Sequence, residues 1–446
     1  MSAEDLAAEL LEQVRRQAGP GAEAVVRVED ADLALTRFAG SAIHQNTAES
    51  RRTLHLQLTV DGGRTAAAST TRARDAAGLV EATLAAARLR PRDPAWPGPA
   101  GPAPLVLPSV ADRATAEADP ALRARLVGDF VAAAGGLSTA GYVQTSAVRT
   151  VLATSAGQHV GGSATAAACD GIARLPGSDG TARQVAAAAG ELDCAALGAR
   201  AAAKARAGTD PSPVDPGRWP VVLEPPAVAD VVAGLLTGQF QARAALDGTG
   251  GLRPGEQQFD PAVSLTDPAG LGLPFDTEGT PKRPVELVRA GVPVGLTSDR
   301  RTAEATGGTS TGHGGPASAT WGPVATDAAL APGTGGSVDD LVAGLERGLL
   351  VTDVWYTRVL DQKRSVWTGL TRNGVWLVED GRVVRPVSTL RFTQSYLEAL
   401  APGAVTVGSD VQALPRTLTS TAWGTHRVAV PALALASWNI TGNAAG

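Results

Sequence analysis

Thr53-Leu-His-Leu-Gln-Leu-Thr-Val60 alternates apolar and polar side chains along its whole length. Successive side chains of a β-strand point to opposite faces of a sheet, so this pattern predicts a strand with one buried face. Asp61-Gly62-Gly63 follows it, and Arg64 to Thr70 comes next as the returning segment. Because Asp-Gly favours tight hairpin turns, the whole stretch predicts an antiparallel hairpin.

The residues on either side of this hairpin add both helices and strands. Upstream, Leu6, Leu10 and Val14 recur at helical spacing and predict an amphipathic helix over residues 5–17. Further strands are predicted at 24–28, 33–38, 142–146, 150–154 and 164–174, and further helices at 75–89, 121–134 and 193–207. Helices and hairpins therefore occur together in the first half of the chain.

The second half repeats this mixture. Val221 to Leu223 is a short apolar strand, and Pro225-Pro226 after it suits the first turn of a helix. Near the end, strands are expected at 367–370, 374–378 and 382–387, with Asn373-Gly374 and Asp380-Gly381 as hairpin turns between them. We therefore predict an α+β class, with mixed, mostly antiparallel sheets and packed helices in an N-terminal and a C-terminal domain.

The length of 446 residues calls for two or three folding units. Six prolines lie between Pro91 and Pro104, and residues 208–217 are also rich in proline, aspartate and threonine, so both segments are expected to be connectors. The expected units are 1–90, 105–207 and 218–446. The first two are expected to pack together as one N-terminal domain.

Composition excludes several classes of function. The formal charge is −5 and no basic run is present, which argues against a nucleic-acid partner. Acidic residues among the first leucines argue against a signal peptide, and no long apolar stretch suits a membrane span, so we expect a cytoplasmic protein. Cys169 and Cys194 are the only cysteines, and we expect them to be buried free thiols.

One glycine-rich segment could carry chemistry. Gly308-Thr-Ser-Thr-Gly312 matches Gly-x-Ser-x-Gly, but a nucleophile elbow needs an apolar strand before it and a helix after it. Polar residues precede the segment, and His313-Gly-Gly-Pro316 follows it. A flexible glycine loop with a solvated histidine is favoured over a serine hydrolase. Because loops often carry function, its substrate-binding candidates are Ser310, Thr311, Gly312 and His313.

The remaining polar residues give no site by spacing alone. Carboxylates gather loosely in the third unit, and solvated turns are favoured over an acid–base pair for Asp267, Asp276, Glu278, Asp299 and Glu304. The other histidines are isolated, and no phosphate-binding loop occurs, so neither a metal nor a nucleotide cofactor is predicted for this chain.

Several segments in a shared order resemble the TldD/PmbA family. They are Leu35-Thr-Arg-Phe-Ala-Gly-Ser-Ala-Ile-His-Gln-Asn46, Asp61-Gly-Gly-Arg64, Val221-Val-Leu223, Phe275-Asp-Thr-Glu-Gly-Thr280, Val288-Arg-Ala-Gly-Val-Pro-Val-Gly295, Gly348-Leu-Leu-Val351 and Gly374-Val-Trp-Leu-Val-Glu-Asp-Gly-Arg-Val-Val-Arg-Pro-Val387. The similarity runs over nearly the whole chain and is weakest between about 90 and 215.

The resemblance implies a lost catalytic site. Catalytic members of this family carry a His-Glu-x-x-x-His helix after the Val-Val-Leu strand, in which the histidines hold zinc and the glutamate activates water. The two histidine positions here are Ala233 and Gly238, and the glutamate position is Gly234. No cysteine follows Cys194, although the family places one near the C-terminus. The chain therefore resembles the zinc-less TldE/PmbA-type members, with no catalytic or metal-binding residue of its own.

These members are implied to be partners of a zinc-bearing TldD-type subunit, so the chain is expected to be inactive alone and to assist the cleavage of unfolded peptides. The alternative is a stand-alone peptide-binding or scaffold protein without a protease role. One candidate contact with the partner is Val428 to Trp438, although a core strand is the favoured interpretation of that segment.

Overall fold

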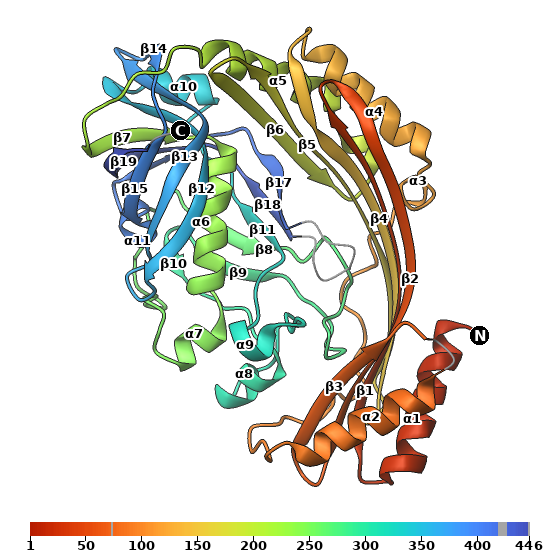
Figure 1. The fold of residues 1–446 in the computed structure, drawn as a ribbon. Coiled ribbons are helices and arrows are strands. Elements are labelled where there is room, and N and C mark those ends of the chain that lie inside the picture. Colours follow the sequence, from red (N-terminus) through yellow and green to blue (C-terminus); the bar gives the residue numbers. More distant parts are fainter. Residues whose placement is uncertain (73–74, 418–425, 445–446) are drawn as a thin grey trace.

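The computed structural model describes residues 1–72, 75–417 and 426–444. An arched sheet with helices on its outer side forms the N-terminal part, and a compact C-terminal part lies against its concave side (Figure 1). The class is α+β, with antiparallel and mixed sheets and packed helices, as predicted.

The N-terminal sheet is antiparallel and has the strand order β3-β2-β1-β4-β5-β6. Its strands are β1 (Glu23–Ala39), β2 (Ala42–Val60), β3 (Arg64–Thr70), β4 (Ser138–Thr154), β5 (His159–Leu175) and β6 (Ser178–Ala186). The hairpin predicted at Asp61-Gly62-Gly63 is present, with Val60 paired to Arg64. Residues of both N-terminal segments, before and after the proline-rich connector, thus share one sheet.

Two groups of helices cover the outer face of this sheet. The helices are α1 (Ala3–Ala18), α2 (Ala76–Leu89), α3 (Arg113–Ala116), α4 (Pro120–Ala133) and α5 (Cys194–Ala207), with a short 3₁₀ turn at Ala189–Glu191. Leucines of α1 and α2 pack on Leu54, Leu56 and Leu58, whereas α4 and α5 cover the other end around Phe130. Cys169 and Cys194 lie in that second core as buried free thiols, which confirms the prediction.

Two strands are longer than predicted. The segments 24–28 and 33–38 belong to one strand, β1, and 142–146 and 150–154 belong to β4. The polar residues between these segments do not interrupt strand pairing, because side chains on neighbouring elements form hydrogen bonds with charged groups among them. In β1, Asp30 stands opposite Arg52 and accepts hydrogen bonds of 2.5 and 2.7 Å from its guanidinium group.

The C-terminal part contains two sheets. The first is mixed, in the order β12-β7-β19-β15-β13-β14, and it also pairs β12 with β13 and β16 with β19. Its strands are β7 (Gly217–Leu223), β12 (Arg347–Asp361), β13 (Val366–Glu379), β14 (Arg382–Pro386), β15 (Leu390–Ser395), β16 (Val405–Val407) and β19 (Leu433–Asn443). Because β12 pairs with both β7 and β13, the strands from β12 round to β13 close into a ring.

The second sheet has the order β10-β9-β8-β11-β18-β17. Its strands are β8 (Leu265–Asp267), β9 (Val285–Arg289), β10 (Val292–Pro293), β11 (Asp327–Leu330), β17 (Gln412–Thr417) and β18 (His426–Val430). The helices of this part are α6 (Pro225–Gly238), α7 (Ala242–Leu246), α8 (Arg300–Ala305), α9 (Ser318–Trp321), α10 (Val338–Ala343) and α11 (Tyr396–Ala399). Helix α6 contacts strands of both sheets, so it forms the centre of the largest core.

One of the turns predicted for this part is wrong. Asn373-Gly374 is a bulge within β13 and not a turn, because β12 continues as its partner on both sides and only Thr352 stands opposite the two residues. Asp380-Gly381 does form the turn between β13 and β14, with positive φ at both residues. Val428 to Trp438 is buried as core strands, which confirms the favoured interpretation of this segment over that of a contact with a partner.

The two parts meet through a small apolar cluster. Val25, Leu152, Val160 and Ala164 lie on the concave face of the N-terminal sheet, and they pack on Leu273 and Phe275 from the C-terminal part. The sheet therefore buries its outer face under helices and part of its concave face under the C-terminal part. No described helix is long and apolar enough to cross a membrane.

Candidate functional site

Helix α6 is the central element of the candidate site. Pro225 and Pro226 begin it, since proline at the first helical positions loses no hydrogen bond. Apolar side chains occur around almost its whole circumference because it lies between two sheets. Its most open side carries Ala233, which is half-buried, and Thr237, which is exposed. Ala233 is one of the three positions at which the sequence resemblance places a zinc motif.

Aromatic and amide side chains fill the space beside the other two positions. A Cβ atom at Gly234 would lie 3.0 Å from the Tyr396 ring and 3.1 Å from the Trp367 ring. These rings stack with centroids 5.5 Å apart and planes 4° from parallel. A Cβ atom at Gly238 would lie 2.6 Å from the Gln362 amide nitrogen, which donates to the Gly238 carbonyl oxygen at 2.7 Å. Glycine at both positions thus permits close packing.

The acid on α6 is held by hydroxyl groups. Asp230, the only carboxylate of the helix, is buried and accepts hydrogen bonds from Thr357 at 3.1 Å and from the Tyr396 hydroxyl at 3.3 Å. In the part of the chain that the structure describes, no three histidines, cysteines or acids converge to form a metal site.

A cleft of about 540 Å³, here called the α6 cleft, opens between this helix and the concave face of the N-terminal sheet. Residues from β4, β5 and β6 form one wall, and Asp230 with parts of β12 and β13 forms the other. Trp355 and Tyr356 lie at the cleft with their rings edge to face, and 46% and 62% of their surfaces are exposed. The Arg372 guanidinium lies 4.0 Å from the centroid of the Trp355 ring.

Charged groups that bridge the two parts line the same cleft. Arg183 of β6 donates to Asp353 of β12 at 2.6 Å and lies 3.8 Å from Asp170 of β5. Burial disfavours the charge on Arg183, but the two carboxylates more than offset this, so its pKa is raised. Burial also raises the pKa of the Tyr142 phenol, which therefore keeps its proton as a hydrogen-bond donor. The cleft combines paired charges, a donor and exposed aromatic rings.

The glycine-rich loop lies elsewhere and is well packed. Ser310 is buried, and its hydroxyl donates to the Ser298 carbonyl oxygen at 3.2 Å and accepts from the Gly312 amide at 3.1 Å. Gly312 adopts a positive φ of 73°, and a Cβ atom there would overlap the backbone of Pro281 and Lys282. The expected flexible, solvated loop is therefore wrong. No strand leads into Ser310 and no helix follows it directly, unlike a nucleophile elbow.

His313 is buried in an ionic network. Its Nε2 atom lies 3.3 Å from Asp267 Oδ2, and its Nδ1 atom lies 2.9 Å from the Thr311 hydroxyl. Asp267 also accepts hydrogen bonds from the Ala269 and Thr326 amides at 2.6 and 3.0 Å. Although burial opposes its charge, the His313 contact and these bonds lower the Asp267 pKa to about 2. The solvated histidine expected from the sequence is thus incorrect.

The nearby carboxylates are also less solvated than expected. Asp276 and Asp299 are buried and Glu278 is half-buried, whereas Glu304 is exposed as predicted but lies on helix α8 and not in a turn. Burial raises the pKa of Asp276 to about 6 and, together with the Asp276 charge, that of Glu278 to about 8. Sequence spacing gave no sign of this, because the fold brings together two separate segments, the loop of Asp276 and Glu278 and the start of α8.

The family model of the PmbA/TldA metallopeptidase C-terminal domain matches residues 216–442. The chain belongs to the TldD/PmbA family. The match begins at β7 and runs through α6 into β19, so it contains the helix with the three zinc-motif positions. No curated protein matches the sequence of the chain.

Solved structures share the fold of this TldD/PmbA-family chain over almost its full length. TldE from Thermococcus kodakarensis superposes with a TM-score of 0.83 at 17% identity, covering 98% of this chain and 99% of that one. A protein from Thermotoga maritima that is described as a candidate modulator of a DNA gyrase gives a TM-score of 0.83 at 18% identity, covering 99% of this chain and 100% of that one. A similar match from Bacteroides thetaiotaomicron gives 0.79 at 17%, with 98% of each chain covered.

The residues of the α6 cleft in this TldD/PmbA-family chain were missed by sequence reasoning. Arg183, Asp353 and Asp170 come from distant strands, so their spacing carries no signal. Trp355-Tyr356 does carry one, because two adjacent aromatic residues in a strand cannot both face the same core. The predicted candidates Ser310, Thr311, Gly312 and His313 lie together in one loop, but hydrogen bonds within the fold occupy all the side chains among them.

Replacing Glu278 by glutamine should flatten the dependence of stability on pH. A carboxyl whose pKa is raised by folding favours the folded state below its unfolded pKa, and this advantage is lost as pH rises through the folded value. Stability of the native chain should therefore fall between about pH 4.5 and pH 8 because of Asp276 and Glu278. The Glu278→Gln variant should exceed it at pH 8 by on the order of 1–2 kcal/mol.

Urea unfolding at intervals from pH 5 to pH 8 measures this difference. Glu304→Gln provides the control, since Glu304 lies on helix α8, whose Arg300 amide donates to Glu278, but is itself exposed. A Glu278→Gln profile parallel to that of the native chain would show that Glu278 is ionised throughout.

Proposed function

We propose that the chain is the non-catalytic subunit of a TldD/TldE-type metallopeptidase complex, which cleaves unfolded or modified peptides. The observation that carries this proposal is a complete family fold around a helix whose motif positions are Ala233, Gly234 and Gly238. The Trp367 and Tyr396 rings pack against Gly234 and fill the space that a catalytic glutamate side chain would need at this position. The zinc and the attacking water would then belong to the partner subunit, and this chain would need no cofactor.

The proposed role in the complex is to shape the space that receives the peptide. An extended peptide exposes its backbone and alternate side chains, which a cleft with paired charges and aromatic rings can contact without strict sequence preference. In the α6 cleft, Arg183 and Asp353 offer polar contacts, and Trp355 and Tyr356 offer apolar surface. We propose this cleft, and not the loop at Ser310 to His313, as the peptide-facing site.

The surface proposed for the partner is the outer part of the β12–β13 hairpin. Val359 and Leu360 expose 42% and 62% of their surfaces on this part of β12, next to the α6 cleft but outside its lining. Large apolar side chains gathered in this way commonly mark a protein interface. Placing the zinc subunit here would also put its active site beside the α6 cleft.

Coexpression with a TldD-type chain tests the subunit role. The two chains should copurify as a complex by light scattering, and degradation of an unfolded peptide should need both. Full activity of the TldD-type chain alone, with no complex formed, would contradict the proposal. A peptide-binding or scaffold protein without a protease role, the alternative, would bind peptide equally well in the absence of any TldD-type chain.

The hairpin surface gives a sharper test of the same proposal. Leu360→Asp should weaken association by about tenfold or more, because it places a charge in an apolar contact. Val383→Asp is the matched control, since Val383 is similarly exposed on β14, which pairs with the opposite end of β13. Equal affinities of the two variants, measured by interferometry on the immobilised partner, would exclude the hairpin as the contact.

A further inference from the structure

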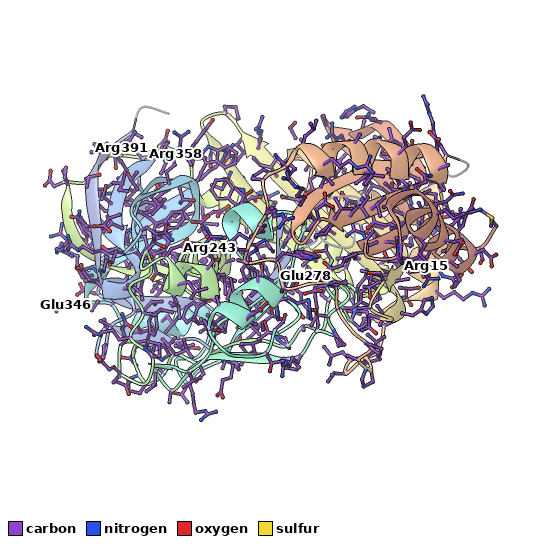
Figure 2. All side chains as sticks on the ribbon, turned by 90° about the horizontal axis from the view of Figure 1, so that it is seen from below. Arg15, Arg243, Glu278, Glu346, Arg358 and Arg391 are labelled. Atoms are coloured by element: carbon purple, nitrogen blue, oxygen red, sulfur yellow. The ribbon has the colours of Figure 1, made fainter. Side chains whose placement is uncertain are left out.

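A second cleft, of about 370 Å³, lies where the other end of the N-terminal sheet meets the C-terminal part. Strands β1, β2 and β3 form one wall, and residues 277–278, 299, 301, 314–316 and 318–319 form the other. Figure 2 shows Glu278 between the two parts of the molecule, far from Arg15 on α1. We call it the junction cleft. Its volume lies within the range of small-molecule sites.

The sheet wall presents nitrogen donors. Arg27 and His55 are direct cross-strand partners, and Gln57 lies two residues further along the same face. Burial, followed by the charges of Arg27 and Arg51, lowers the His55 pKa to about 3, so the ring is neutral near pH 7. Its Nε2 atom is shielded from solvent yet has no hydrogen-bond partner among the described residues. Buried polar atoms normally have a partner, so this nitrogen suits a ligand.

The opposite wall presents carboxylate oxygens. Asp299 Oδ1 accepts the Thr302 amide at 2.8 Å and so caps α8, whereas its Oδ2 atom makes no hydrogen bond within the described ranges. Glu278 Oε2 accepts the Arg300 amide at 2.9 Å, which leaves Oε1 for another donor. The remaining cation of this wall, Arg301, is paired with Asp93. The two walls therefore differ in polarity.

We propose that the junction cleft binds a short peptide with both of its termini free. The carboxylate would be bound by Arg27 and His55, and the ammonium group by Asp299. Charge-assisted hydrogen bonds of this kind are about twice as strong as neutral ones. Trp96 and Pro97 add apolar surface for the ligand's side chains. This site is distinct from the α6 cleft, and the inference does not rest on the proposed partnership.

Calorimetry on the isolated chain with three ligands tests the proposal. Ala-Ala should bind, and both N-acetyl-Ala-Ala and Ala-Ala-amide should bind about tenfold or more weakly, since each lacks one charged end. The absence of any heat with Ala-Ala at millimolar concentration, or equal binding of all three, would overturn the assignment.

Two variants separate the ends of the ligand. Asp299→Asn removes the charge but keeps a good helix cap, so the protein should fold and lose affinity for Ala-Ala but not for its acetylated form. His55→Leu should lose affinity for Ala-Ala but not for the amide, without loss of stability, because it removes a buried polar atom that has no partner in the described chain.

The matched control is Asp119→Asn, which alters the capping aspartate of α4 outside the cleft. It should bind Ala-Ala as the native chain does. If Asp299→Asn and His55→Leu also bind Ala-Ala unchanged, the peptide does not occupy the junction cleft and the proposal is wrong.

Discussion

Replacing Gly234 by glutamate should lower the free energy of unfolding by about 3 kcal/mol and should not create a zinc peptidase. The new Cβ atom would press on the stacked Trp367 and Tyr396 rings, 3.0–3.1 Å away, and the carboxylate would be placed in a core. The gain in helix propensity over glycine, about 1 kcal/mol, is too small to compensate. Gly238→His should add a clash with Gln362.

Ala233→His is the matched control for this prediction. Ala233 is half-buried on the open side of α6, so a histidine there should be tolerated with a loss below about 1 kcal/mol. Urea unfolding, zinc content after dialysis and peptidase activity should be measured for each single variant and for the triple variant. A folded triple variant with zinc-dependent cleavage would show that the packing around α6 is not the obstacle.

Replacing Asp267 by alanine should have the largest effect of any single change outside α6, a loss of about 3–5 kcal/mol. The substitution would leave the Ala269 and Thr326 amides and the His313 ring without their acceptor in a buried region. Because Asp267 ends β8 and its partners lie in three other segments, the loss should loosen the loop that contains Ser310 and His313.

Asp267→Asn and Glu304→Ala complete this experiment. Asparagine keeps an acceptor oxygen and should recover part of the lost stability, whereas Glu304→Ala, at an exposed carboxylate, should be nearly neutral. Chemical denaturation gives the three free energies. An Asp267→Ala protein as stable as the native chain would mean that the network contributes nothing to folding.

Local patterns were sufficient to predict most elements but not their lengths. Leu6, Leu10 and Val14 correctly indicated α1, and Asp380-Gly381 correctly indicated a turn, because each signal lies within a few residues. Asn373-Gly374 has the same turn chemistry, yet it became a bulge because β12 holds the strand on both sides of it. Pairing with a distant partner thus overrode a local preference.

The candidate sites were harder to predict for a related reason. Sequence spacing cannot show that His313 reaches Asp267, or that Arg183 reaches Asp353 across the two parts of the chain. Asp276 and Asp299 were predicted to be solvated but are buried, because loops remote in sequence cover them. Small residues at Ala233, Gly234 and Gly238 were informative only through the family resemblance. The rings that occupy the space beside them became visible only in the fold.

The ring of strands in the C-terminal part also bears on how the protein is made. Strand β7 lies between β12 and β19, and β19 is translated about 210 residues after β7 ends. The N-terminal sheet, by contrast, is complete once β6 has left the ribosome. The N-terminal part can thus form first during synthesis, while α6 and its apolar neighbours stay uncovered until the last strand emerges. That interval is when a chaperone would be most needed.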